Sequence, residues 1–306
     1  MYYTNCKLAN LTWFKVGGCA KLLFIPESSN DLVTFLQNFS NNRIDNIIDP
    51  NIINTKQITI LGAGSNVLIS DKGVDGITIK IGRGLSYIKL ENKNDEYFLI
   101  VGSGTLNYSL SQYCMINGIV DFEFLSSIPG SIGGGVYMNA GSYGNEYKDI
   151  LVKVKCVDHE GNYKEFNVND LEMGYRYSAL QGKEYIVLEA CFKCKKPNVA
   201  LSKIIQSKIN EIKNHRRSTQ PIHEKTCGST FTNPDNLSAW QVVDSLGMRG
   251  YKHNGAMISN MHTNFLINYN NATADDIWTL GEMVRDKAKS KFDLDLKWEI
   301  KKLGIW

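Results

Sequence analysis

The chain has 306 residues, of which 34 are basic and 31 acidic, so its net charge is only +3 at neutral pH. A chain of this length can bury a large core without disulfide or metal staples, and this charge excludes an extended basic surface for nucleic acid. No apolar run approaches the about 18 residues that a membrane-spanning helix needs, and the first residues lack the features of a signal peptide. We therefore expect a cytoplasmic protein that neither binds nucleic acid nor enters a membrane.

The first third of the chain alternates strands and helices. Residues 19–26 (CAKLLFIP) predict a strand, and residues 28–42 predict an amphipathic helix capped by Ser29 or Asn30. The apolar face of this helix consists of Leu32, Phe35, Leu36 and Phe39. Residues 57–70 (QITILGAGSNVLIS) then predict a strand, a glycine turn and a second strand.

Strands dominate the middle of the chain, with one helix predicted near residues 108–117. The predicted strands cover residues 76–81, 97–104, 151–158, 161–168 and 184–194. After Lys195 the character of the chain changes, because residues 198–217 carry apolar side chains at helical spacing with lysines on the other side. The apolar positions are Leu201, Ile204, Ile205, Ile209 and Ile212. We read the basic side as a solvated face rather than a nucleic-acid surface.

The last hundred residues mix both element types. A strand is predicted at residues 263–268 and a helix at residues 273–292, and the chain closes on an alternating segment at residues 294–303. The whole pattern predicts an α+β protein. We expect two β-rich subdomains and a smaller C-terminal α/β domain, covering residues 1–72, 73–195 and 196–306.

The cysteines and histidines give no sign of a metal site or a disulfide framework. Seven cysteines are an odd number, and the one close pair, Cys191 and Cys194, falls on a predicted strand where the two thiols would point to opposite faces. No second pair completes a zinc site, and the five histidines form no metal-binding pair. We therefore expect reduced thiols and no catalytic metal.

A glycine turn at residues 62–66 (GAGSN) follows a predicted strand and so suggests a dinucleotide site. A Rossmann fingerprint would need a third glycine three residues after the second, followed by a helix. Val67 stands at that position and the chain continues as a strand, which argues against this fingerprint. The turn could cup phosphate oxygens with its backbone N–H groups, or it could be a simple hairpin.

A second glycine-rich segment, residues 129–144 (PGSIGGGVYMNAGSYG), contains six glycines in sixteen residues. The glycines at 130, 133, 134 and 135 remove every Cβ from one side of the segment, as close contact with a ligand requires. A sharp chain reversal would use the same residues. A P-loop is excluded, because no Lys-Ser or Lys-Thr pair follows at the required spacing. This segment alone leaves a ligand wall and a chain reversal equally open.

Six short motifs occur in a fixed order along nearly the whole chain. They are TWFKVGG (12–18), GAGSN (62–66), FEFLSSIPGSIGGGVYMNAGSYG (122–144), GYRYS (174–178), GSTFTNP (228–234) and LKWEIKKLG (296–304). In this order they closely resemble the UDP-N-acetylenolpyruvoylglucosamine reductase family, flavoenzymes of bacterial peptidoglycan precursor synthesis. The resemblance extends from about Thr12 to Gly304.

The resemblance implies a two-subdomain FAD-binding unit of the vanillyl-alcohol-oxidase (PCMH) type and a C-terminal domain that closes over a sugar nucleotide. FAD would be held non-covalently, in a backbone cradle that we expect to be poor in helix, and NADPH would be the co-substrate. The implied FAD contacts are Gly62, Ala63, Gly64, Ser65, Asn66, Pro129, Gly130, Ser131, Ile132, Gly133, Gly134, Asn139, Ala140 and Gly141.

The implied reaction has two halves. NADPH gives a hydride to FAD, and the reduced flavin gives one from N5 to the enolpyruvyl methylene carbon of the UDP-sugar. This addition builds negative charge on the substrate carboxylate, which cationic or protonated groups must stabilise before a placed donor protonates the α-carbon. By the resemblance, Arg176 and Glu299 would stabilise the enolic intermediate, and Ser229 would donate the proton. Read singly, the same residues could instead be a ring-stacked arginine, a turn serine and an exposed strand residue.

The resemblance also implies contacts to the sugar nucleotide from Asn233, Lys252, Gln220 and His262. The chain departs from part of the family, because residues 178–184 are too few for the tyrosine-bearing loop that covers the substrate in one branch. It therefore resembles the branch that lacks this loop. Cys227 stands where a small residue is usual, and we expect a packed side chain there rather than a reactive thiol.

Two other functions remain open at this point. One is a different flavin oxidoreductase of the same fold, such as a sugar-lactone oxidase, although the first 150 residues hold no histidine for a covalently linked flavin. The other is a non-catalytic nucleotide-binding protein, against which the presence of Arg176, Ser229 and Glu299 argues. The expected partners are the UDP-sugar and NADPH, and the chain is expected to act as a monomer.

Overall fold

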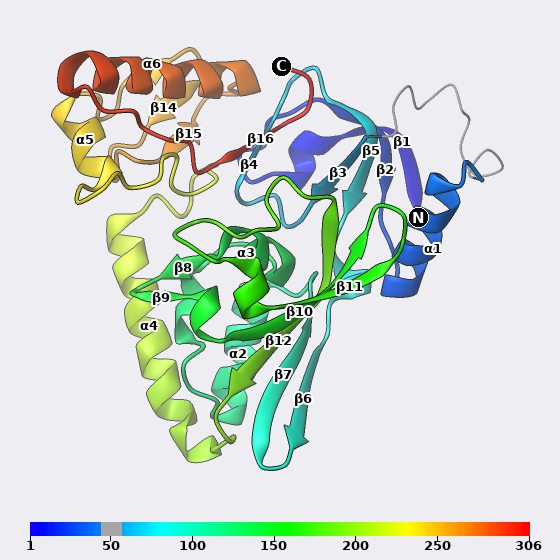
Figure 1. The fold of residues 1–306 in the computed structure, drawn as a ribbon. Helices are drawn as coiled ribbons and strands as arrows, with labels where there is room; N and C mark the ends of the chain where they lie inside the picture. Colours follow the sequence, from blue (N-terminus) through cyan, green and yellow to red (C-terminus); the bar gives the residue numbers. More distant parts are fainter. Residues whose placement is uncertain (44–56) are drawn as a thin grey trace.

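The structure is a computed structural model that describes residues 1–43 and 57–306. Figure 1 shows three neighbouring regions, which we call layers, and each is built around one of the three largest sheets with its own helices. Strands and helices are mixed throughout, as predicted for an α+β protein.

A four-stranded mixed sheet forms the first layer, in the order β1-β2-β5-β3. β1 runs antiparallel to β2, whereas β5 runs parallel to both of its neighbours. These strands are β1 (Tyr2–Lys7), β2 (Cys19–Phe24), β3 (Ile58–Leu61) and β5 (Val74–Lys80). Because β5 completes this sheet, the first layer extends beyond the boundary at residue 72 that the sequence suggested.

Helix α1 (Ser29–Ser40) packs on this sheet, and the four residues of its predicted apolar face are all buried. The predicted cap is wrong, however. Ser28 is the N-cap, and its Oγ accepts a hydrogen bond of 3.0 Å from the Asp31 N–H. Its backbone is extended, so its hydroxyl reaches back over the first turn, which neither Ser29 nor Asn30 can do from inside the helix.

A five-stranded antiparallel sheet forms the second layer, in the order β11-β10-β12-β7-β6. Its strands are β6 (Ile88–Lys93), β7 (Glu96–Gly102), β10 (Leu151–Asp158), β11 (Tyr163–Asn167) and β12 (Tyr185–Cys194). Helix α2 (Asn107–Asn117) shares an apolar core with this sheet. The sequence predicted all of these elements except β6.

The glycine-rich segment differs from the expectation of a cradle poor in helix. Residues Ile132–Met138 form helix α3, although three consecutive glycines are unfavourable inside a helix. Packing outweighs this cost at Gly135, where a Cβ would lie 2.2 Å from Cζ of the buried Tyr147 ring. The helix ends at Asn139, whose left-handed φ of 41° is tolerated by asparagine.

Helix α4 (Ser202–Thr219) lies along the second layer (Figure 1), although the sequence assigned it to the C-terminal domain. Lys208 of α4 forms an ion pair of 3.3 Å with Glu123, next to α2. Ile204 is 56% exposed rather than part of the apolar face. The buried apolar residues of the helix are Ile205 and Ile209. The boundary at residue 195 therefore stays a prediction, and the contacts of α4 favour a later one.

The C-terminal layer is a three-stranded antiparallel sheet, in the order β13-β14-β15, with two helices. Its elements are α5 (Ala239–Ser245), β13 (Lys252–His253), β14 (Ala256–Ile258), β15 (Leu266–Asn268) and α6 (Ala274–Phe292). The chain then leaves this layer, and its last strand, β16 (Lys301–Leu303), pairs in parallel with β4 (Val67–Ile69) beside the first layer, as Figure 1 shows.

All seven cysteines are free, and Cys191 and Cys194 both lie on β12. Within residues 1–43 and 57–306, no group of three or more His, Cys, Asp or Glu side chains is placed to hold a metal ion. The helices in the same ranges include none long and apolar enough to span a bilayer.

Candidate active site

The glycine turn at residues 62–66 meets the segment that leads into α3. A Cβ on Gly62 would lie 3.1 Å from Ser131 Oγ, and a Cβ on Gly130 would lie 2.9 Å from Ser65 Oγ. Neither serine hydroxyl forms a hydrogen bond within the described part of the chain. The two glycine segments therefore form one cradle, lined by backbone and by two hydroxyls that can still donate to an anion.

Gly134 is the most open of the three consecutive glycines at the start of α3. A Cβ there would meet no atom closer than Ser131 Oγ at 3.9 Å, and the residue is exposed. Its two neighbours differ, because a Cβ on Gly133 would lie 3.0 Å from Ser103 and one on Gly135 would enter the Tyr147 ring. Packing inside the protein thus accounts for Gly133 and Gly135 but not for Gly134, whose backbone is open to a ligand.

The turn at residues 62–66 also contacts the C-terminal segment. Asn66 Nδ2 donates to the carbonyl oxygen of Glu299 (3.3 Å), and the Asn66 carbonyl accepts from the Lys301 N–H (3.0 Å). Cys227 Sγ donates to the Val67 carbonyl (3.4 Å). Burial raises the pKa of this thiol to about 12, so Cys227 is a packed side chain rather than a reactive thiolate.

Arg176 and Glu299 form a largely buried ion pair. Arg176 Nε lies 2.8 Å from Glu299 Oε1, and the two side chains are 21% and 15% exposed. The guanidinium also donates from Nη2 to the Gly141 carbonyl (3.1 Å) and lies 4.9 Å from the centre of the Tyr175 ring. Arg176 therefore stacks on a ring and binds Glu299 at the same time. The interpretation of Glu299 as an exposed strand residue is wrong.

Burial raises the pKa of the Glu299 carboxyl, and the charge and hydrogen bond of Arg176 only partly oppose this shift. Lys301 adds a second cation next to this carboxylate, and Glu299 opposes the lowering of the Lys301 pKa that burial causes. Lys301 could have been foreseen, because it lies two residues after Glu299 in an alternating segment. Gln181, whose Oε1 accepts from Lys301 Nζ (2.9 Å), has no such sequence signal.

The backbone of Arg176 adopts a left-handed conformation with φ of 56°, which is uncommon for arginine. Gly174 and Tyr177 exchange two backbone hydrogen bonds of 3.1 Å around it. Asn139 Nδ2 then donates to the Gly174 carbonyl (2.8 Å), and Asn139 is itself fully buried. Asn139 therefore supports the turn that carries Arg176, and its contact with the cofactor stays a prediction.

Ser229 is joined to this pair through the backbone. The next residue, Thr230, accepts a hydrogen bond of 2.8 Å from the Glu299 N–H at its carbonyl oxygen. The Ser229 hydroxyl is half-buried and forms no hydrogen bond within residues 1–43 and 57–306. It is free to bind a ligand in a way that a hydroxyl engaged in a turn is not.

Two of the four predicted substrate contacts lie near the ion pair. The backbone N–H of Asn233 donates to the Tyr175 hydroxyl (3.4 Å), while its side-chain Oδ1 accepts from the first turn of α5. His262 Nδ1 accepts from the Asn264 N–H (3.3 Å), and the Asn264 carbonyl in turn accepts from the Thr230 N–H (2.8 Å). Burial lowers the pKa of His262, which favours the neutral ring.

The other two predicted substrate contacts are less closely joined to the pair. Gln220 Oε1 accepts from Arg216 Nε (2.9 Å) at the end of α4. Lys252 is exposed, and its ammonium lies 4.7 Å from the centre of the Tyr269 ring. In the part of the chain that the structure describes, neither side chain contacts Arg176 or Glu299, so both assignments remain predictions.

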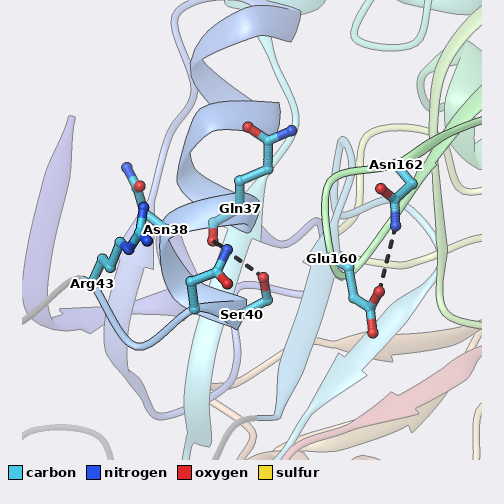
Figure 2. Close-up of a pocket in the computed structure, with 7 residues that line it drawn as sticks. Gln37, Asn38, Ser40, Arg43, Glu160 and Asn162 are labelled. Atoms are coloured by element: carbon cyan, nitrogen blue, oxygen red, sulfur yellow. Dashed lines mark hydrogen bonds between the residues drawn. The ribbon is translucent and has the colours of Figure 1, made fainter.

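A separate polar hollow lies at the end of α1 (Figure 2). It is lined by Gln37, Asn38, Ser40, Asn41, Arg43, Glu160 and Asn162. Its side chains bind locally: Ser40 donates to the Gln37 carbonyl (3.1 Å), and Asn162 donates to Glu160 (3.4 Å). None of its lining residues is a predicted site residue, and we assign it no function.

Relatives of known name match the chain over its whole length. It is 45% identical to UDP-N-acetylenolpyruvoylglucosamine reductase of Rickettsia felis, with 99% of this chain and 96% of the relative covered. A relative of the same name from Orientia tsutsugamushi is 42% identical, with 99% and 94% covered. The chain belongs to the UDP-N-acetylenolpyruvoylglucosamine reductase family.

Family models and a solved structure agree with this assignment. Residues 20–167 match an FAD binding domain, and residues 220–303 match the C-terminal domain of UDP-N-acetylenolpyruvoylglucosamine reductase. The crystal structure of the MurB reductase from Thermus caldophilus superimposes with a TM-score of 0.77 at 28% identity, covering 99% of this chain and 98% of that one. The predicted family, α+β fold class and FAD cofactor are thereby confirmed.

The cradle described above fits an FAD. At Gly62 and Gly130 a side chain would fill the cradle, and at Gly134 it would enter the open space beside it. The free hydroxyls of Ser65 and Ser131 can donate to phosphate oxygens. The individual cofactor contacts remain predictions.

Proposed function

We propose that the protein reduces UDP-N-acetylglucosamine enolpyruvate to UDP-N-acetylmuramate in the cytoplasm, with FAD bound and NADPH as the source of the hydride. The observation that carries this proposal is the buried pair of Arg176 and Glu299, which lies between the FAD cradle and Ser229. Asn66 of the cradle and Thr230, next to Ser229, both hydrogen-bond the backbone of Glu299.

Bound FAD, held in the cradle that includes Gly62 and Gly130, would supply the hydride-transfer chemistry between NADPH and the methylene carbon of the substrate. The role of Arg176 follows from its charge and its fixed position. Its guanidinium is held by Glu299, Gly141 and the Tyr175 ring, so it can meet negative charge that develops on the substrate carboxylate without first reorganising. Burial raises the pKa of Glu299, so this carboxyl takes up a proton more readily than an exposed glutamate does, and its protonated form can donate a hydrogen bond to the same carboxylate.

Ser229 is the proposed proton donor to the α-carbon of the substrate. Its hydroxyl forms no hydrogen bond within the described part of the chain, so a bound substrate can be its hydrogen-bond partner. Donation leaves an alkoxide, which must recover a proton from water after turnover, and nearby cations lower the cost of that charge. Lys301, whose ammonium interacts with Glu299, adds positive charge to the same site.

Four residues are proposed to contact the sugar nucleotide. The side-chain Nδ2 of Asn233 forms no hydrogen bond within residues 1–43 and 57–306, and Lys252 would meet the diphosphate as a point charge. Gln220 and His262 would contact the same sugar nucleotide. We also propose that the chain acts as a monomer.

Single-turnover kinetics test the proposal. The wild-type holoenzyme is reduced by NADPH without oxygen and is then mixed with the enolpyruvyl sugar, and flavin absorbance is followed in both steps. We expect Ser229→Ala to keep the first step and to slow the second by about 10²- to 10⁴-fold, the usual contribution of a placed proton donor.

Ser290→Ala, an exposed serine of α6, serves as the matched control and should leave both steps unchanged. A wild-type enzyme that NADPH reduces but the sugar does not reoxidise would exclude the proposed substrate. Normal reoxidation of the Ser229→Ala enzyme would exclude only the role of Ser229.

A further inference from the structure

The relative position of Ser229 and Glu299 is set by a very short strand pairing. Phe231 and Trp298 form an antiparallel bridge, flanked by two hydrogen bonds: Thr232 N–H to the Lys297 carbonyl (2.9 Å) and Glu299 N–H to the Thr230 carbonyl (2.8 Å). A two-stranded contact of this length is marginal by itself. Something else must therefore keep its register.

The side chain of Trp298 supplies that support. Because side chains alternate along an extended segment, Trp298 points away from the face on which Glu299 meets Arg176. Its ring stacks on Trp278 of α6, with centroids 4.6 Å apart and planes inclined by 12°. Directly across the pairing, the Phe231 ring lies 5.2 Å away. One indole thus touches both strands of the pairing and the helix behind it.

Helix α6 is shaped to receive this ring. A Cβ on Gly281 would lie 2.1 Å from Trp298 Cη2, so only glycine leaves room for the indole at that point. Trp298 Nε1 donates to Glu282 Oε1 at 2.6 Å. Arg285, one turn further on, binds Glu282 (2.8 Å) and the Leu296 carbonyl (2.8 Å), so the helix holds the strand at two points.

We propose that Trp298 is a positioning residue for the second half-reaction. Its indole occupies the space that Gly281 leaves on α6 (the Gly281 notch) and is held there by its hydrogen bond to Glu282. It thereby fixes the segment that carries Ser229 against the segment that carries Glu299. This inference rests on the proposed function, because it concerns the distance between the proton donor and the group that stabilises the enolic intermediate. A misplacement of about 1 Å at a reacting centre can cost about 100-fold in rate.

The test compares half-reactions in holoenzyme variants. Trp298→Leu, which removes the ring and its N–H, should slow reoxidation by saturating enolpyruvyl sugar by about 100-fold while leaving reduction by NADPH unchanged. Trp298→Phe keeps a ring in the notch and should recover most of the reoxidation rate. Phe292→Leu is the matched control, since it removes an exposed aromatic ring at the end of α6 whose contact in the described part of the chain is with Lys291 rather than with Trp278 or Trp298, and both of its half-reactions should match the wild type.

A second variant keeps the test decisive if the leucine protein does not fold. Gly281→Ala should slow reoxidation in the wild-type background, because its methyl displaces the indole, and should slow it less in the Trp298→Phe background, whose smaller ring leaves room for the methyl. Equal effects in both backgrounds, or a Trp298→Leu enzyme that is reoxidised at the wild-type rate, would overturn the inference. A Trp298→Leu enzyme that loses both half-reactions would overturn it too. If the sugar does not reoxidise the reduced wild-type enzyme, both the proposed function and this inference are excluded.

Discussion

The carboxyl group of Glu299 lies where the protein disfavours its charge. Burial raises its pKa, and neither Arg176 at 2.8 Å nor the nearby ammonium of Lys301 fully reverses the shift. A group whose folded pKa lies above the unfolded value binds its proton more tightly in the folded state. Its ionisation therefore lowers the stability of the protein.

We expect this cost to appear as a pH dependence that Glu299→Gln removes. As pH rises from the unfolded pKa of a glutamate, about 4.3, through the raised folded value, the free energy of unfolding of the wild type should fall relative to the variant. Urea denaturation at a series of pH values measures the difference. A difference that stays constant, or that grows in favour of the wild type with rising pH, would contradict the assignment.

The sequence predicts some residues of the site and misses others. Arg176, Ser229 and Glu299 were predicted from motifs, and the structure joins their segments by an ion pair and a backbone hydrogen bond. Gln181 could not be predicted, because its partner Lys301 lies 120 residues away in the sequence.

Helix α3 shows the same limit for an element. Its glycines argue against a helix, yet the Tyr147 ring packs on the backbone at Gly135 and stabilises the helical form. Tertiary packing outweighs intrinsic propensity here, as it often does for short elements. The pattern of α1, by contrast, is local and amphipathic, and its buried face was predicted correctly from sequence.

Two neighbouring glycines of α3 should respond in opposite ways to the same change. Gly134→Ala should stabilise the apoprotein by up to about 1 kcal/mol through helix propensity and should weaken FAD binding, because the methyl enters the open cradle. Gly135→Ala should destabilise it by about 1–3 kcal/mol through overpacking against Tyr147. Thermal unfolding of apoprotein and FAD titration measure both effects. Unchanged FAD affinity in the first variant would contradict the cradle.

At the scale of the whole molecule, the site lies where all three layers meet. The first layer supplies the turn at residues 62–66, the second supplies Arg176, and the C-terminal segments supply Ser229 and Glu299. The motif order predicted which segments take part. It could not predict that β5 crosses into the first sheet, that α4 lies on the second layer, or that β16 returns to β4, because long-range pairing leaves no local sequence signal.

Removal of residues 301–306 tests how much this return contributes. The truncation deletes β16 and the hydrogen bonds of Lys301 to Asn66, Ser70 to Leu303 and Ile305 to Gly73. We expect a loss of about 1 kcal/mol for each backbone hydrogen bond and little reoxidation by the sugar, measured by urea denaturation and single-turnover kinetics. Deleting Trp306 alone is the control and should preserve both. Wild-type stability in the longer truncation would show that β16 is dispensable.

The return of the last strand also bears on how the protein is made. Translation proceeds from the N-terminus, so the two FAD-facing layers leave the ribosome while Glu299 and β16 are still to be made or lie inside the exit tunnel. The nascent chain can fold most of its cofactor cradle before its catalytic constellation exists. Competence for the sugar half-reaction therefore requires Glu299 and β16 to be made and paired, later than the segments that form the cradle.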